Sequence, residues 1–133
     1  MVLLVLLVLA LFVMQTLIPG GFREPAAAGE KGAAIEDRGN RENLRPLTLV
    51  GQRATRALAN MQEALPVFLA LALMNLIVGT AAGLAITGAI IFLVARVLYV
   101  PLYLAGIAPI RSLAWGVGWI GLLLMIVPLV QRI

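Results

Sequence analysis

The segment "ALPVFLALALMNLIVGTAAGLAITGAIIFLVA", residues 64–95, contains no charged residue and decides the fold. It is too long for one membrane span, because about 20 apolar residues cross a hydrocarbon core of roughly 30 Å. The small and turn-forming residues "GTAAG" at 79–83 divide it into two halves. We therefore predict a tight hairpin of two transmembrane helices, covering about residues 54–78 and 84–106.

Two further apolar runs flank this hairpin, at residues 1–18 and 112–130. The whole chain of 133 residues is 62% hydrophobic and only 12% charged, whereas a soluble domain is about 25% charged. An isolated strand cannot satisfy its backbone in lipid, so each span is expected to be helical. The sequence predicts an all-α, integral membrane four-helix bundle that forms a single domain over residues 1–133.

The charges indicate an orientation in the membrane. The polar loop at 20–52 and its flank carry seven basic residues: Arg23, Lys31, Arg38, Arg41, Arg45, Arg53 and Arg56. The second loop carries none, the turn at 106–111 carries Arg111, and only Arg132 lies beyond the last span. The positive-inside rule therefore predicts that loops 20–52 and 106–111 are cytoplasmic. A cleaved signal peptide is the alternative for residues 1–18, which lack a positively charged start.

Several site classes are excluded by composition. The chain contains no cysteine and no histidine, which removes thiolate metal sites, a cysteine nucleophile and the commonest metal ligand. We predict no metal site. The net charge of +4 is not accompanied by a basic helix, so no nucleic-acid partner is expected.

Polar residues on the two central spans form two stripes. Arg53, Arg56, Asn60 and Glu63 are spaced 3, 4 and 3 residues apart, and Arg96, Tyr99 and Tyr103 are spaced 3 and 4 apart. Each set falls on one helix face. Counted from the turn at Ala81, Glu63, Arg96 and Tyr99 lie within roughly 5 Å of one level, at about 1.5 Å per residue. Asn60 matches Tyr103 in the same way, so the stripes are expected to face each other.

A charge inside a membrane span costs about 2.5–3.5 kcal/mol and is usually paired or directed into a cavity. A structural Glu63–Arg96 ion pair is one explanation. It leaves the remaining donors unexplained, because Arg56, the two tyrosines and Arg111 exceed what one carboxylate can accept. We therefore predict an electropositive crevice near the cytoplasmic edge, suited to an anionic ligand.

The order of these motifs resembles the MAPEG superfamily, the membrane-associated proteins of eicosanoid and glutathione metabolism. The resemblance rests on "RALANMQEALPVF" at 56–68, which fits the pattern R-x-x-x-N-x-x-E, and on "ARVLYVPLYLAGIAPIRS" at 95–112. Ala59 and Leu58 stand where several eicosanoid-type members carry polar residues, so the chain is closer to the bacterial branch. This resemblance implies a homotrimer in a bacterial inner membrane.

The resemblance also implies a function. By position, Arg56, Asn60, Glu63, Arg96, Tyr99 and Tyr103 correspond to glutathione-contacting residues, to which we add Arg53 from the same stripe. Arg111 resembles the catalytic arginine that stabilises the glutathione thiolate. A glutathione-dependent transferase or peroxidase acting on lipophilic electrophiles is then expected, with glutathione as co-substrate and lipid as the surroundings. A non-catalytic binding or scaffold protein of the same fold is the alternative, and a small carrier or channel subunit is a third.

Overall fold

The computed structural model describes residues 1–25 and 45–132. The described elements are helices: α1 (Val2–Leu17), the short 3-10 turn η1 (Pro19–Gly21), α3 (Leu49–Val78), α4 (Leu84–Ala105) and α5 (Ala108–Val130). An isolated bridge between Arg23 and Leu47 closes the base of the first loop. The basic residues Lys31, Arg38 and Arg41, used above for orientation, lie outside the described residues.

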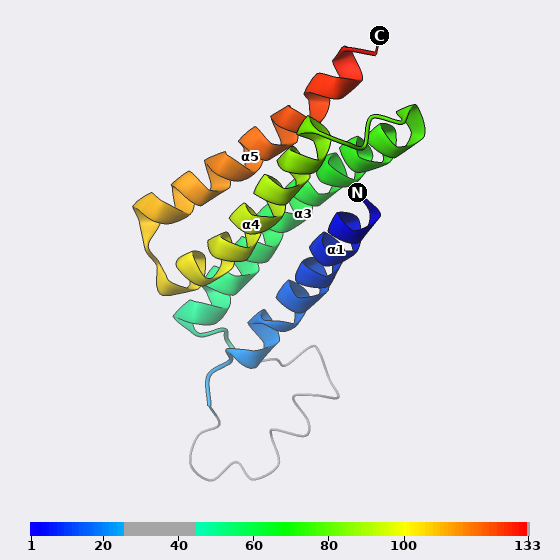
Figure 1. Ribbon diagram of the computed structural model, residues 1–133. Helices are drawn as coiled ribbons and strands as arrows, with labels where there is room; N and C mark the ends of the chain where they lie inside the picture. The colour runs from blue at the N-terminus through cyan, green and yellow to red at the C-terminus, as the bar shows by residue number, and fades with distance from the viewer. Residues whose placement is uncertain (26–44, 133) are drawn as a thin grey trace.

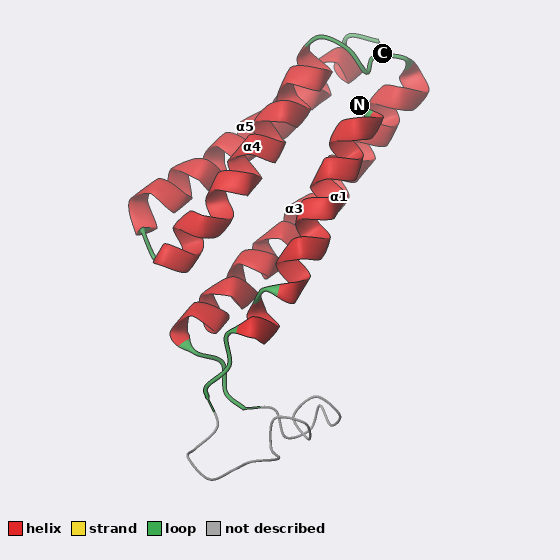
Figure 2. Ribbon diagram, turned by 60° about the horizontal axis from the view of Figure 1, so that its bottom comes forward, coloured by secondary structure: helices red, strands yellow, loops and turns green. Residues whose placement is uncertain are grey.

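The four long helices run side by side, with α1 against α3 and α4 against α5 (Figure 1). Each is long and apolar enough to cross a membrane. The end of α1, the start of α3 and the α4–α5 turn lie at one end, while the start of α1, the α3–α4 turn and the end of α5 lie toward the other (Figures 1 and 2). The predicted all-α architecture with four candidate spans is confirmed.

Local hydrogen bonding fixes the helix ends near the first loop. Helix α3 begins at Leu49, five residues before the predicted span at 54, because Thr48 caps it. The Thr48 hydroxyl accepts a hydrogen bond from the Gly51 amide at 3.2 Å and donates one to the Phe22 carbonyl at 3.0 Å. The cap therefore also ties the start of α3 to the segment that follows α1.

The core lies where all four helices meet. Val8 of α1, Phe68 of α3, Phe92 of α4 and Met125 of α5 are each 0% exposed. The Phe68 and Phe92 rings stack with centroids 4.8 Å apart. Asn75 is also fully buried, and its amide nitrogen donates to the Leu71 and Met125 carbonyls at 2.8 and 3.0 Å. A buried amide with such partners links α3 to α5.

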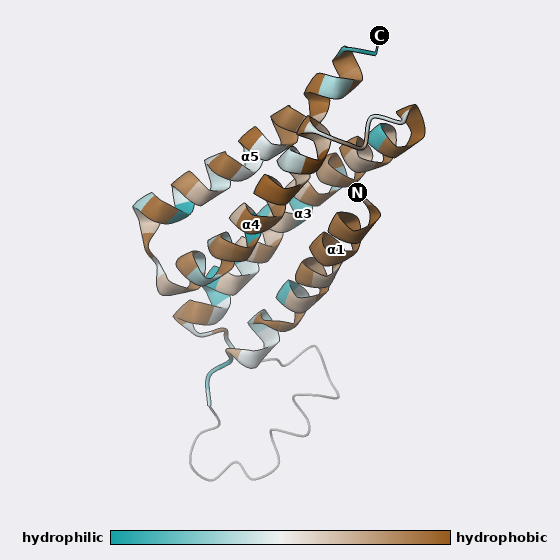
Figure 3. Cartoon of the chain, viewed as in Figure 1, coloured by the Kyte–Doolittle hydropathy of each residue, from teal (hydrophilic) through white to brown (hydrophobic). Residues whose placement is uncertain are grey.

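Apolar residues predominate along all four helices, as the colours of Figure 3 show, and many of these side chains are exposed. Ile77, Leu17 and Leu113 are 84%, 73% and 69% exposed. Side chains of this kind on every helix would make a soluble protein aggregate, because contiguous apolar patches of this extent are not kept in water. The exposed faces are therefore suited to contact with lipid chains.

Candidate functional site

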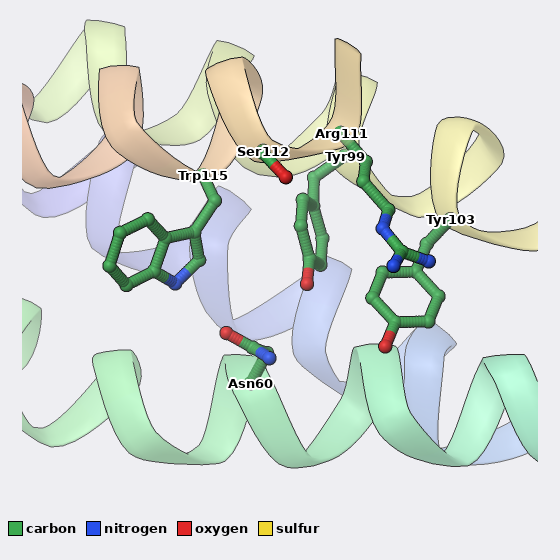
Figure 4. Close-up of a pocket in the computed structure, with 6 residues that line it drawn as sticks. All are labelled: Asn60, Tyr99, Tyr103, Arg111, Ser112 and Trp115. Carbon is green, nitrogen blue, oxygen red and sulfur yellow. The ribbon is translucent and has the colours of Figure 1, made fainter. Parts of the chain in front are cut away.

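A cavity of about 390 Å³ lies between α3, α4 and α5, toward the end of the bundle where α3 begins and α4 turns into α5. Figure 4 shows the side chains that line it: Asn60, Tyr99, Tyr103, Arg111, Ser112 and Trp115. Asn60 and Tyr103, which the sequence places at one level, are thus on the wall of the same cavity. Its volume lies within the range of about 300–1,000 Å³ that is typical of small-molecule sites.

Arg111 provides the positive charge of this cavity. Its guanidinium carbon lies 4.5 Å from the centroid of the Tyr103 ring, in a cation–π arrangement. The Tyr103 ring in turn lies against Tyr99, with centroids 5.3 Å apart. Arg111 makes no hydrogen bond from its guanidinium to the residues of the described ranges. Its orientation is therefore set by an aromatic face, and its donors are left available to a ligand.

Neutral polar groups complete the wall. The Asn60 amide on α3, the Tyr99 hydroxyl on α4 and the Trp115 indole on α5 point into the same space (Figure 4). The Ser112 hydroxyl donates to the Ala108 carbonyl at 3.1 Å, which leaves its oxygen free to accept another hydrogen bond. The cavity thus offers one fixed cation and several uncharged donors and acceptors, a combination that suits an anionic peptide-like ligand.

Arg96 does not line this cavity. It is only 1% exposed, and its three guanidinium nitrogens have no hydrogen-bond partner among the described residues. Its guanidinium carbon lies 5.2 Å from the Phe92 ring centroid and 5.6 Å from that of Tyr99. Arg96 therefore lies behind Tyr99, in the bundle interior. A hydrogen-bonded Glu63–Arg96 pair is not formed within the described chain.

Arg56 and Glu63 lie outside the cavity, with both side chains exposed on α3. Their spacing from Asn60, four and three residues, places them on the same stripe of the helix. A charge exposed on a membrane-spanning helix is unfavourable next to lipid. These two side chains are therefore in position for a ligand or a protein surface that approaches the open side of the cavity next to Asn60.

Arg53 is engaged elsewhere. Its Nη1 atom donates a hydrogen bond of 3.1 Å to the carbonyl oxygen of Leu104, near the end of α4. The same guanidinium lies directly against Gly106, where an added Cβ would come within 2.6 Å of it. Arg53 is not on the cavity wall. The predicted set is therefore divided: the structure brings together Asn60, Tyr99, Tyr103 and Arg111, whereas Arg53, Arg56, Glu63 and Arg96 surround them.

Sequence reasoning missed two residues of the wall, Ser112 and Trp115. Both follow Arg111 on α5, and Trp115 lies one turn beyond it, so helical spacing carried the signal. A second cavity of about 280 Å³ lies between α4 and α5 and has only aliphatic side chains on its wall, among them Ile90, Val94 and Val117. Because that cavity has no polar side chain, the first is the stronger candidate for chemistry.

Within residues 1–25 and 45–132, no three carboxylates or other metal-binding side chains gather as a metal site requires. Comparison with curated proteins and with solved structures gives no significant match. The sequence model that describes the MAPEG family matches residues 1–130, which is nearly the whole chain. This match and the four long apolar helices describe an integral, multi-pass membrane protein. The chain therefore belongs to the MAPEG family, whose members are membrane proteins with functions generally related to glutathione.

Proposed function

We propose that this protein is a membrane-embedded, glutathione-dependent transferase or peroxidase that acts on lipophilic electrophiles. The observation that carries the proposal is the placement of Arg111, stacked on Tyr103 at the wall of a polar cavity inside an otherwise apolar bundle. Membership of the MAPEG family supports glutathione as the ligand class. The proposed place in the bacterial branch is supported by the apolar residues Leu58 and Ala59 beside Asn60.

The side chains present fit the chemical groups of glutathione, which has two carboxylates, one ammonium and one thiol. Arg56 is a suitable partner for a carboxylate, and Glu63 for the ammonium, since both lie beside Asn60 on α3. Asn60, Tyr99 and Ser112 offer hydrogen bonds to the peptide groups. Arg111 would then face the thiol from the start of α5 and favour its ionised form, because a nearby cation lowers the pKa of a thiol from about 8.5.

This arrangement would support two reactions of the glutathione thiolate. In a displacement reaction the glutathione sulfur forms a bond to an electrophilic carbon while the bond to a halide breaks, and the thiol proton goes to solvent. In hydroperoxide reduction, two glutathione molecules and one hydroperoxide give one disulfide, one alcohol and one water. Arg111 would serve both reactions by stabilising negative charge on the sulfur at the wall of this cavity.

The exposed charges of α3 support contact with further copies of the chain, and the family resemblance implies three copies. Arg56 and Glu63 lie on the outer face of a membrane-spanning helix, where contact with lipid would cost about 2.5–3.5 kcal/mol for each charge. A neighbouring copy of the chain would remove that cost and close the open side of the cavity. The proposed location is the bacterial inner membrane, by the resemblance, with loops 20–52 and 106–111 in the cytoplasm. The orientation is supported by Arg23 after η1, Arg53 near the start of α3 and Arg111 near the start of α5, which belong to the same end of the bundle.

Native mass spectrometry of the detergent-solubilised protein tests the trimer. We expect a species of about three times the chain mass of 14.1 kDa. Glu63→Ala should shift the population toward smaller species, because it removes a charge from the proposed subunit contact. Arg132→Ala, at the opposite end of the bundle, serves as the control and should leave the assembly unchanged. A wild-type protein that is monomeric in several mild detergents would contradict the proposal.

Thermal unfolding in the presence of glutathione tests the ligand. At one hundred times its dissociation constant, glutathione should stabilise the wild-type protein by about 2.7 kcal/mol. Arg56→Ala should lose most of this stabilisation, and Arg132→Ala should keep it. S-methylglutathione, which cannot ionise at sulfur, should still bind. No stabilisation of the wild type, or an equal stabilisation of Arg56→Ala, would favour the non-catalytic scaffold instead.

A further inference from the structure

The contact between Arg53 and the end of α4 connects two walls of the cavity. Arg53 belongs to α3, two turns before Asn60, while Leu104 and Gly106 form the end of α4. The last carbonyl groups of a helix have no partner within it. Arg53 supplies a donor to one of them, the Leu104 carbonyl, at 3.1 Å. This hydrogen bond joins residues 51 positions apart in the sequence.

Gly106 allows this contact. Its φ angle of +79° lies in the left-handed region, and its amide donates to the Leu102 and Tyr103 carbonyls at 3.1 Å each. A Cβ at this position would lie 2.6–2.7 Å from the carbon and both terminal nitrogens of the Arg53 guanidinium. The flat guanidinium therefore lies on the glycine backbone, which no other residue type would permit at this distance.

The residues held by this contact adjoin the proposed catalytic group. Tyr103 immediately precedes Leu104, and the turn at Gly106 leads within five residues to Arg111. The stacking of Arg111 on Tyr103 depends on the angle at which α5 leaves this turn. Asn60 faces them from α3 across the cavity (Figure 4). The Arg53 contact thus joins α3, which carries Asn60, to the turn between Tyr103 and Arg111.

We infer that Arg53 is a positioning residue, which holds the α4–α5 turn against α3 and thereby aligns Tyr103 and Arg111 with Asn60. This inference rests on the proposed function, because it concerns the same cavity. It assigns Arg53 a role different from that of a glutathione ligand. The guanidinium is directed at the Leu104 carbonyl and the Gly106 backbone, and it does not reach the cavity wall.

Gly106→Ala and Gly79→Ala form a matched pair of variants that tests this role. Both glycines end a helix in the left-handed conformation, with φ angles of +79° and +74°. Nothing lies within 4 Å of a Cβ at Gly79, whereas a Cβ at Gly106 meets Arg53. Gly79→Ala therefore carries the backbone strain alone. We expect kcat/KM to fall about tenfold more in Gly106→Ala than in Gly79→Ala, since a misplacement of 1 Å can cost up to about a hundredfold.

Arg53→Gln distinguishes positioning from ligand binding. Affinity is measured for glutathione and for its diethyl ester, which lacks both free carboxylates, from the fluorescence of Trp115 in a Trp119→Phe background. We expect Arg53→Gln to lower the affinity for both ligands by the same factor, within about twofold. Arg53→Lys, which keeps a donor for the Leu104 carbonyl, should recover part of the loss. In the Arg53→Gln background, Gly106→Ala should have no more effect than Gly79→Ala, because the collision partner is gone.

Near-ultraviolet circular dichroism of the ligand-free protein gives a readout that does not depend on glutathione. The aromatic signal should change in the same way in Arg53→Gln and Gly106→Ala, and stay constant in Gly79→Ala. The positioning role would be overturned if the two glycine variants had equal kcat/KM and equal aromatic signals. It would also be overturned if Arg53→Gln weakened the affinity for glutathione but not the affinity for the ester. If the wild type binds neither ligand, the proposed function fails, and the aromatic signal alone decides the role of Arg53.

Discussion

Arg111→Ala should lower kcat for conjugation of glutathione to chlorodinitrobenzene by about 10²–10³-fold, with a much smaller change in KM for glutathione. Losses of this size follow removal of one preorganised donor at a centre of developing charge. The split between kcat and KM is expected because, in the proposed complex, Arg111 would face the thiol, whereas Arg56, Glu63 and Asn60 would contact the rest of glutathione.

The pH dependence of the fall in kcat caused by Arg111→Ala tests whether Arg111 acts on the ionisation of the thiol. If Arg111 lies beside the thiol of bound glutathione, it lowers the pKa of that thiol from about 8.5, and the wild-type rate should be close to its plateau at neutral pH. Without the guanidinium the pKa returns toward its ordinary value, and the rate of the variant should still rise with pH through 8.5. The difference between wild type and Arg111→Ala is therefore expected to be largest at low pH and to shrink in alkaline solution.

The thiolate itself can be followed by its ultraviolet absorbance when glutathione is added to the protein. We expect this signal in the wild type, loss of it in Arg111→Ala, and partial retention in Arg111→Lys, which keeps the charge but not the planar group that stacks on Tyr103. Arg132→Ala is the control for loss of a surface cation. An activity loss with the same magnitude at every pH, or an unchanged thiolate signal, would assign the role to another group.

The fold follows from the sequence because lipid imposes a simple rule. An uncharged run of sufficient length must satisfy its backbone as a helix, so the four apolar segments and the turn at 79–83 specify the bundle. The start of α3 at Leu49 does not follow from this rule, which predicts a span from about residue 54. Its first turn is fixed by the Thr48 cap and the contact with Phe22, both of which depend on where the first loop returns.

Part of the site was also predictable. Distance along a helix is regular, so residues counted from the hairpin turn fall at matching depths, and Asn60 and Tyr103 do share a cavity. The partner of a long side chain is not fixed in this way. Arg53 reaches a backbone carbonyl 51 residues away, and Arg96 turns into the core between aromatic rings. Sequence spacing places each residue along its helix but does not give the direction of either guanidinium.

Gly121→Ala is expected to cause the largest loss of stability, about 3 kcal/mol. Gly121 lies where α5 crosses α4, and an added Cβ would come within 2.6 Å of the Gly88 carbonyl oxygen and 2.8 Å of the Phe92 amide nitrogen. Both are backbone atoms and cannot move aside as a flexible side chain does. The helices must separate, and overpacking of this kind typically costs about 1–3 kcal/mol, with backbone collisions at the upper end.

Gly116→Ala is the matched control, because Gly116 belongs to the same helix and nothing lies within 4 Å of a Cβ there. Alanine is a better helix former than glycine, so this variant should be neutral or more stable by up to about 1 kcal/mol. Unfolding of both variants in mixed detergent micelles measures the difference. Equal stability of the two would mean that α4 and α5 are not held at the separation seen here. A selective loss in Gly121→Ala indicates that close backbone approach at Gly88 and Gly121 fixes the α4–α5 pair that carries Tyr103 and Arg111.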